Sequence, residues 1–104
     1  MNINQVKTIT VIGSGLIGCS VAMEFALAGY QVCLNSRSQI SLDRGMEKIN
    51  GTLGELAVLG VVTQQDANDA PVRITPQADL KLSIRDADVV IENVYEDLEL
   101  KQQI

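Results

Sequence analysis

Histidine is missing from the 104-residue sequence. Its absence removes the commonest general acid or base, the usual metal ligand, and any Ser–His or Cys–His catalytic pair. Cysteine is scarce, and the two that occur, Cys19 and Cys33, do not belong to a metal-binding or redox spacing. We expect both cysteines to pack as small core residues rather than to react.

Basic residues and long apolar runs are also in short supply. There are 8 basic and 13 acidic residues, which gives a net charge of −5, and no basic stripe is present. This argues against nucleic acid and anionic membrane as partners. The N-terminus lacks the layout of a signal peptide and no apolar run reaches membrane-spanning length, so we expect a cytoplasmic protein. With 46% hydrophobic residues, the chain has enough apolar side chains for the core of one small domain.

A glycine-rich turn separates a predicted strand from a predicted helix. Residues 7–12 are rich in β-branched side chains and are bounded by glycine, which favours a buried strand. The helix covers about residues 16–28, and Gly29 stands where a C-cap glycine would. Apolar residues recur in it at helical spacing: Ile17, Val21, Phe25 and Ala28. A second strand at residues 31–35 completes a strand–turn–helix–strand unit.

The turn itself matches the pattern G-x-G-x-x-G through Gly13, Gly15 and Gly18, which in this context predicts a dinucleotide-binding site. Gly13 makes the tight turn, Gly15 lets a pyrophosphate approach the backbone, and Gly18 lets the helix pack closely on the strand. The free N–H groups and positive end of the helix face the phosphates. The alternative is a glycine turn that joins a strand to a helix without binding anything.

The middle of the chain predicts a long amphipathic helix at residues 41–59, with Ser41 as its N-cap. Five apolar residues recur at intervals of three and four: Leu42, Met46, Ile49, Leu53 and Leu56. We interpret three glycines inside this helix, at positions 45, 51 and 54, as local irregularity rather than as sites of close packing or ligand approach. Residues 63–66 are typical of the start of a short helix.

Two further strands complete the prediction of an α/β fold with a parallel, Rossmann-type, partial doubly wound sheet. Residues 72–75 lie between two prolines, which limits this strand or confines it to an edge. Residues 88–94 contain a continuous apolar run, typical of a parallel strand covered on both faces. Asn93 and Glu96 lie at or just beyond its carboxyl end, where ligands bind in such sheets. From the residues alone, a solvated helix start is the favoured interpretation of Glu96 and Lys101.

Three blocks of sequence together resemble the 3-hydroxyacyl-CoA dehydrogenase family, in its N-terminal nucleotide-binding domain. The blocks are residues 10–32, 74–80 and 87–101, and the last is much more specific than the glycine motif. The resemblance implies an NAD(P)-dependent oxidoreductase of fatty acid or related metabolism. Such an enzyme transfers hydride between its cofactor and a 3-hydroxyacyl group on CoA or a carrier, or a related hydroxy acid.

The resemblance also implies residue roles. The turn from Gly13 to Gly18 would hold the pyrophosphate, with Ser14, Leu16 and Ile17 as the intervening residues. Glu96 and Lys101 match family residues that contact the nicotinamide half of the cofactor. Thr52 falls near a family serine that touches the acyl-CoA.

The sequence departs from the family pattern in three respects. The family continues past the position of Ile104 with the rest of the sheet and a helical domain for substrate and dimer contacts. Its catalytic His–Glu pair lies in that part. We therefore expect residues 1–104 to be a truncated dinucleotide-binding domain that is inactive by itself. Ser36, followed by Arg37, replaces the usual aspartate after the second strand, which tips the prediction from NAD toward NADP. Asn93 replaces a usual small residue.

Two other functions remain open from the sequence. The chain would also be consistent with a non-catalytic nucleotide-binding or self-associating module, or with a crystallin-like structural role, because fold does not determine function. The open edge beside residues 88–94 leads us to expect self-association, as a homodimer.

Overall fold

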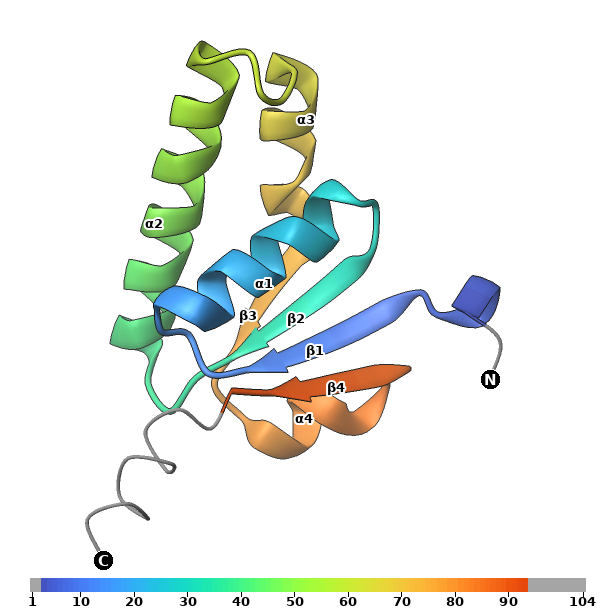
Figure 1. The fold of residues 1–104 in the computed structure, drawn as a ribbon. Coiled ribbons are helices and arrows are strands. Elements are labelled where there is room, and N and C mark those ends of the chain that lie inside the picture. The colour runs from blue at the N-terminus through green and yellow to red at the C-terminus, as the bar shows by residue number, and fades with distance from the viewer. Residues whose placement is uncertain (1–2, 94–104) are drawn as a thin grey trace, which may run out of the picture.

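Four parallel strands form one sheet in the order β3-β2-β1-β4 (Figure 1). The structure is a computed structural model, and it describes residues 3–93. The strands are β1 (Thr8–Ile12), β2 (Gln31–Asn35), β3 (Ile74–Gln77) and β4 (Val89–Glu92). This arrangement confirms the predicted α/β fold with a partial, Rossmann-type parallel sheet, in which the chain moves outward from β1 to β3 and then returns to the other side of β1.

Helices cover the two faces of this sheet unequally. They are α1 (Leu16–Leu27), α2 (Gln39–Val58), α3 (Gln64–Asp69) and α4 (Leu80–Arg85), with short 3-10 turns at Ile3–Gln5 and Pro71–Arg73. Helices α1 and α2 lie on one side, α3 packs beside α2, and the short α4 lies on the other side (Figure 1). Among residues 3–93, no helix combines the length and the apolar character needed to cross a membrane.

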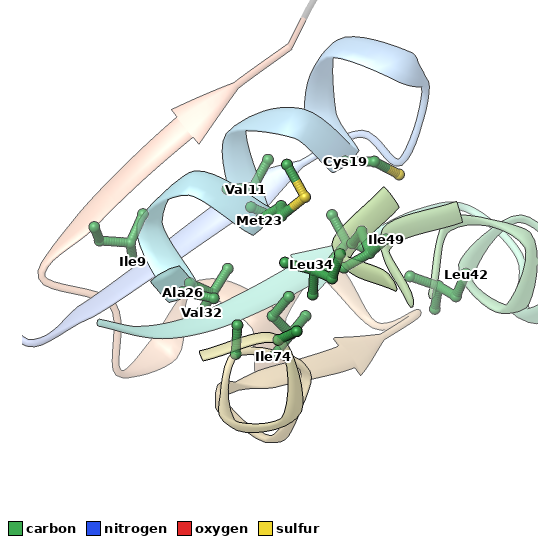
Figure 2. Packing of buried hydrophobic residues seen from close by; sticks show 14 residues of the cluster. Ile9, Val11, Cys19, Met23, Ala26, Val32, Leu34, Leu42, Ile49 and Ile74 are labelled. Atoms are coloured by element: carbon green, nitrogen blue, oxygen red, sulfur yellow. The ribbon is translucent and has the colours of Figure 1, made fainter. Parts of the chain in front are cut away.

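The main core lies between α1, α2 and the facing side of the sheet. Val11 pairs with Leu34 in the parallel register, and both are fully buried. Figure 2 shows Met23 and Ala26 of α1 among the strand residues of this cluster. The predicted apolar face of α2 is confirmed: Leu42, Ile49 and Leu53 are buried, and Met46 and Leu56 pack against the cluster.

Helix α1 buries a different face from the one marked by its large apolar residues. Its buried residues are Gly18, Cys19, Ala22, Met23 and Ala26. Ile17 is exposed, and Val21 and Phe25 are only partly buried. The helix is apolar almost all round, so spacing alone identified a helix but not its inner side. The small residues face the sheet because they let the helix axis approach it closely.

Three predicted element ranges were wrong. Strand β4 covers Val89–Glu92 rather than residues 88–94, and its Val89 and Val90 are exposed rather than covered on both faces. Helix α2 begins at Gln39, and its N-cap is Ser38 rather than Ser41, because the Ser38 hydroxyl accepts a hydrogen bond of 3.2 Å from the Ser41 N–H. Strand β3 covers Ile74–Gln77 rather than 72–75, since Pro71 starts a 3-10 turn that occupies the first part of the predicted range. Its predicted edge position is confirmed, and the edge tolerates Pro76 within the strand.

Helix α4 is an element that the sequence did not reveal. It is only six residues long, and Asp79 caps it by accepting a 2.9 Å hydrogen bond from the Leu82 N–H. Polar groups join it to the sheet: the Thr10 hydroxyl donates to the Ser83 carbonyl, and the Asn35 amide donates to the Ser83 hydroxyl at 3.0 Å. Since Thr10 and Asn35 face away from α1, these bonds hold the crossover between β3 and β4 on the second face.

The carboxylate of Asp88, at the surface, joins the starts of β1 and β4. Asp88 Oδ2 accepts hydrogen bonds from the backbone N–H groups of Lys7 (2.8 Å) and Thr8 (3.0 Å). The Asp88 N–H in turn donates to the Thr8 carbonyl at 2.9 Å. The two N–H donors hold the pKa of the Asp88 carboxyl below its ordinary value of 3.8, because they favour the ionised form.

We expect Asp88→Asn to lower the melting temperature at pH 7. Because the pKa of Asp88 is lower in the folded than in the unfolded chain, its ionised carboxylate stabilises the fold at pH values above the unfolded-state pKa. This stabilisation is lost as the pH falls through the folded-state pKa. The difference in melting temperature between wild type and variant should therefore be largest near neutral pH and should shrink below about pH 4. Calorimetric melts from pH 7 to pH 3 measure it. Asp86→Asn, at an exposed neighbouring position, is the control; an equal loss there, or a pH-independent difference, would refute the assignment.

Candidate functional site

The glycine turn lies at the carboxyl ends of the central strands. Gly13 has a φ of +105°, which favours glycine, and its N–H donates to the Asn35 carbonyl at the end of β2 (2.8 Å). Gly15 is the N-cap of α1 and provides no side-chain cap. No described atom lies within 4 Å of the position that a Cβ at Gly15 would take. The turn thus presents open backbone at the start of a 12-residue helix.

Gly18 makes the contact that holds α1 against this turn. A Cβ on Gly18 would lie 1.9 Å from the Gly13 carbonyl oxygen, which no real structure tolerates. The predicted role of Gly18 in close packing is therefore supported by geometry, although its partner is the turn backbone. Leu16 and Ile17, in the same first turn of α1, are 64% and 55% exposed. These apolar side chains border the open backbone.

Helix α2 supports the turn from the other side through Gly45. A Cβ there would lie 3.1 Å from Cys19 Sγ and 3.5 Å from Ser14 Cβ. Gly45 is buried, so its interpretation as local irregularity was wrong, whereas no described atom lies within 4 Å of the Cβ positions of Gly51 and Gly54. The Ser14 hydroxyl contacts the Ser41 carbonyl at 3.4 Å, which further ties turn to helix.

The two cysteines differ in their surroundings. Cys19 is buried in the core and donates from its thiol to the Ser14 carbonyl at 3.1 Å, as expected for a packing residue. Cys33 is only partly buried and faces the α4 side of the sheet. Burial raises the pKa of both thiols, which disfavours the reactive thiolate.

Ser36 and Arg37 follow directly on the end of β2, next to the Asn35 carbonyl that receives the Gly13 N–H. Ser36 is partly buried and Arg37 is exposed. The structure therefore brings the predicted discriminating pair to the same end of the sheet as the glycine turn. A hydroxyl and a guanidinium stand there in place of a carboxylate.

Thr52 lies away from the turn, on the side of α2 that faces α1. It lines a cavity of about 60 Å³ together with Leu16 and Lys48. Because Leu16 belongs to the first turn of α1, this cavity extends from Thr52 to the start of that helix. The remaining predicted site residues, Glu96 and Lys101, lie outside the described residues.

Asn93 lies directly after β4 and beside the glycine turn, at a position to which the sequence alone assigned no role. Its backbone N–H donates to the Ile12 carbonyl at 3.0 Å, so it continues the β1–β4 pairing beyond Glu92. Its side chain lies against Gly13 and Gly18.

Within residues 3–93, no cluster of His, Cys, Asp and Glu has the arrangement of a metal site. The open glycine turn, the uncapped helix start and the polar residues after β2 fit a dinucleotide.

We expect Gly18→Ala to destabilise the fold strongly and to abolish nucleotide binding, because the added methyl group must displace the Gly13 carbonyl or the whole of α1. The loss should exceed about 2 kcal/mol, which is typical of forced overpacking against backbone. Urea unfolding measures it. Gly51→Ala is the matched control: it lies in the interior of α2 with open space around it, and should be neutral or stabilising by up to about 1 kcal/mol. Equal behaviour of the two variants would contradict the packing argument.

Comparison with known proteins identifies relatives of this chain. A 3-hydroxybutyryl-CoA dehydrogenase of Bradyrhizobium diazoefficiens is 38% identical over 99 residues, which are 95% of this chain and 33% of the relative. A 3-hydroxyadipyl-CoA dehydrogenase of Escherichia coli is 35% identical over 100 residues, which are 96% of this chain and 21% of the relative. The chain thus spans about a third or less of the length of these relatives.

Solved structures agree in fold. A 3-hydroxybutyryl-CoA dehydrogenase of Escherichia coli matches with a TM-score of 0.84 and 33% identity, covering 95% of this chain and 21% of that one. The sequence profile of the family described as "3-hydroxyacyl-CoA dehydrogenase, NAD binding domain" matches residues 8–104. The match includes both the glycine turn and the block after β4. The chain therefore belongs to the 3-hydroxyacyl-CoA dehydrogenase family, within its NAD-binding domain.

Proposed function

We propose that this chain is the cofactor-binding part of an oxidoreductase that acts on 3-hydroxyacyl groups carried by CoA or a carrier protein, or on related hydroxy acids. The observation that carries the proposal is the open backbone at Gly15, held in place by the contact between Gly18 and Gly13. Family membership supplies the cofactor class, a nicotinamide dinucleotide. When bound, that cofactor accepts or donates the hydride, and the chain orients it.

Each predicted site residue has a proposed part in this function. The backbone from Gly13 through Ser14 to Gly18 receives the pyrophosphate, and Leu16 and Ile17 cover it with apolar surface. Ser36 and Arg37 contact the adenosine ribose. Glu96 and Lys101 contact the nicotinamide half, and Thr52 contacts the acyl-CoA through the cavity between α1 and α2.

We also propose that catalysis needs residues beyond this segment. The sequence contains no histidine to exchange a proton with the substrate hydroxyl, and the relatives are three or more times longer. Residues 1–104 would then be the N-terminal part of the dinucleotide-binding domain, inactive without a helical substrate domain. A cytoplasmic location without nucleic acid or anionic membrane partners is proposed on the acidic composition.

The choice between NAD and NADP is proposed to favour NADP, or at least to tolerate it. A carboxylate after β2 would bond the ribose 2′-hydroxyl and repel a 2′-phosphate. Ser36 removes that repulsion and provides a hydroxyl donor. Arg37 is exposed, so its guanidinium is accessible to a phosphate. Charge-assisted Arg–phosphate bonds are worth about 1.5–3 kcal/mol when well formed.

We expect the wild-type chain to bind NADPH at least as tightly as NADH, and Ser36→Asp to weaken NADPH binding by about tenfold or more relative to NADH. Titration calorimetry with both reduced cofactors measures the ratio. Arg37→Ala removes the positive charge proposed to contact the phosphate. Arg44→Ala, which removes a positive charge at an exposed position on α2, is its control. Wild-type chain that binds NADH ten times more tightly than NADPH would contradict the preference. Failure to bind either cofactor would contradict the proposed function itself.

Self-association through β4 is proposed because β4 is an outer strand of the described sheet. Val89 and Val90 are 36% and 45% exposed on it, and exposed apolar strand edges pair with other strands. We expect a homodimer by light scattering at high concentration, and a monomer for Val90→Lys, since a lysine blocks such edges. Val72→Lys is the control at an exposed position away from β4. A strictly monomeric wild-type chain would refute this surface.

A further inference from the structure

Asn93 faces the glycine turn because of its place directly after β4. Ile91 pairs with Val11, and its side chain packs against the core on the α1 face of the sheet. Asn93 lies two residues further along and continues the pairing through its backbone bond to Ile12. Since alternate residues of a strand face the same side, its side chain points to the α1 face, just beyond the end of the core.

The amide group lies over the two glycines that shape the turn. Asn93 Cβ is 3.3 Å from the Cβ position at Gly13, and Asn93 Nδ2 is 3.6 Å from the Cβ position at Gly18. The side chain is only partly buried, so its amide is both held and accessible to a ligand. The backbone N–H of Asn93 is already used in the sheet. What this residue adds at the turn is therefore its side-chain amide.

The site around this amide favours an anion. The Nδ2 group carries two N–H donors, and it lies beside the first turn of α1, whose backbone N–H groups and dipole also attract negative charge. Because positions 13 and 18 are glycines, neither contributes a side chain that would separate this amide from the backbone of the turn. A diphosphate seated on the turn would meet the backbone N–H donors of the helix start, and Asn93 Nδ2 offers a side-chain donor beside them.

We propose that Asn93 is a cofactor-binding residue that donates from Nδ2 to the pyrophosphate, an inference that rests on the proposed dinucleotide-binding function. It adds a side-chain donor to a site that the glycine motif builds from backbone alone. It also selects for the charge of the ligand, because a donor amide at this point favours a diphosphate and a carboxylate in its place would repel one.

The test measures binding of ADP and NADH to the 104-residue chain by titration calorimetry. Both ligands carry the adenosine half and two phosphates, but ADP lacks the nicotinamide riboside. We expect Asn93→Ala to weaken both ligands by the same factor, about tenfold. Asn93→Asp should weaken them by about a further tenfold, and raising the salt concentration should narrow that extra loss, since a partly exposed charge is screened.

Control variants separate this role from a structural one. Asn50→Ala and Asn50→Asp change an exposed asparagine of α2 and should leave both affinities unchanged. Melting temperatures without ligand report any loss of packing against Gly13 and Gly18. Such a loss alone would not make affinity fall from wild type to the alanine variant and again to the aspartate variant, with only the second decrease depending on salt. Asn93→Ala that binds ADP as tightly as wild type overturns the proposal, as does a loss confined to NADH. A wild-type chain that binds neither ligand overturns the proposed function, and this inference falls with it.

Discussion

Helix α1 approaches the glycine turn so closely that a Cβ at Gly18 would lie 1.9 Å from the Gly13 carbonyl oxygen. This approach aligns the start of α1 with the ends of β1, β2 and β4. It also lets the small residues Ala22 and Ala26 sit directly on the sheet, where the core is fully buried. The same contact therefore serves both stability and the geometry of the open backbone, because the helix cannot move away without losing its packing on the strands.

The turn is supported from three directions. The Gly13 N–H donates to the Asn35 carbonyl of β2, and Gly45 of α2 packs against Ser14 and Cys19. Asn93, directly after β4, lies against Gly13 and Gly18. None of these supports is a neighbour of the turn in sequence. A backbone held in this way need not reorganise when a phosphate arrives, and preorganised donors are what make such a site effective. The position of the turn is thus fixed by elements distant along the chain.

The second face of the sheet shows how little of this arrangement is local. Thr10 and Asn35 belong to apolar strands, yet they point toward α4 and bind Ser83 there. The alternation of apolar and polar residues along a strand does not indicate which short segment will form hydrogen bonds with the polar side chains. Helix α4 was missed for this reason: six residues are too few for a helical period, and its cap and its polar contacts become meaningful only after the strands are assembled.

The sequence by itself determined the four strands, the helices α1, α2 and α3, the glycine motif and the inner face of α2, and its prolines limited β3 to a short strand or an edge. These features depend on periodicity, turn chemistry and proline, which act over a few residues. Tertiary structure alone decided which side of α1 is buried, why Gly45 is a glycine, and that Asn93 meets the turn. An almost uniformly apolar helix has no local preference for one face, and a close contact between distant segments depends on the space left after both have packed.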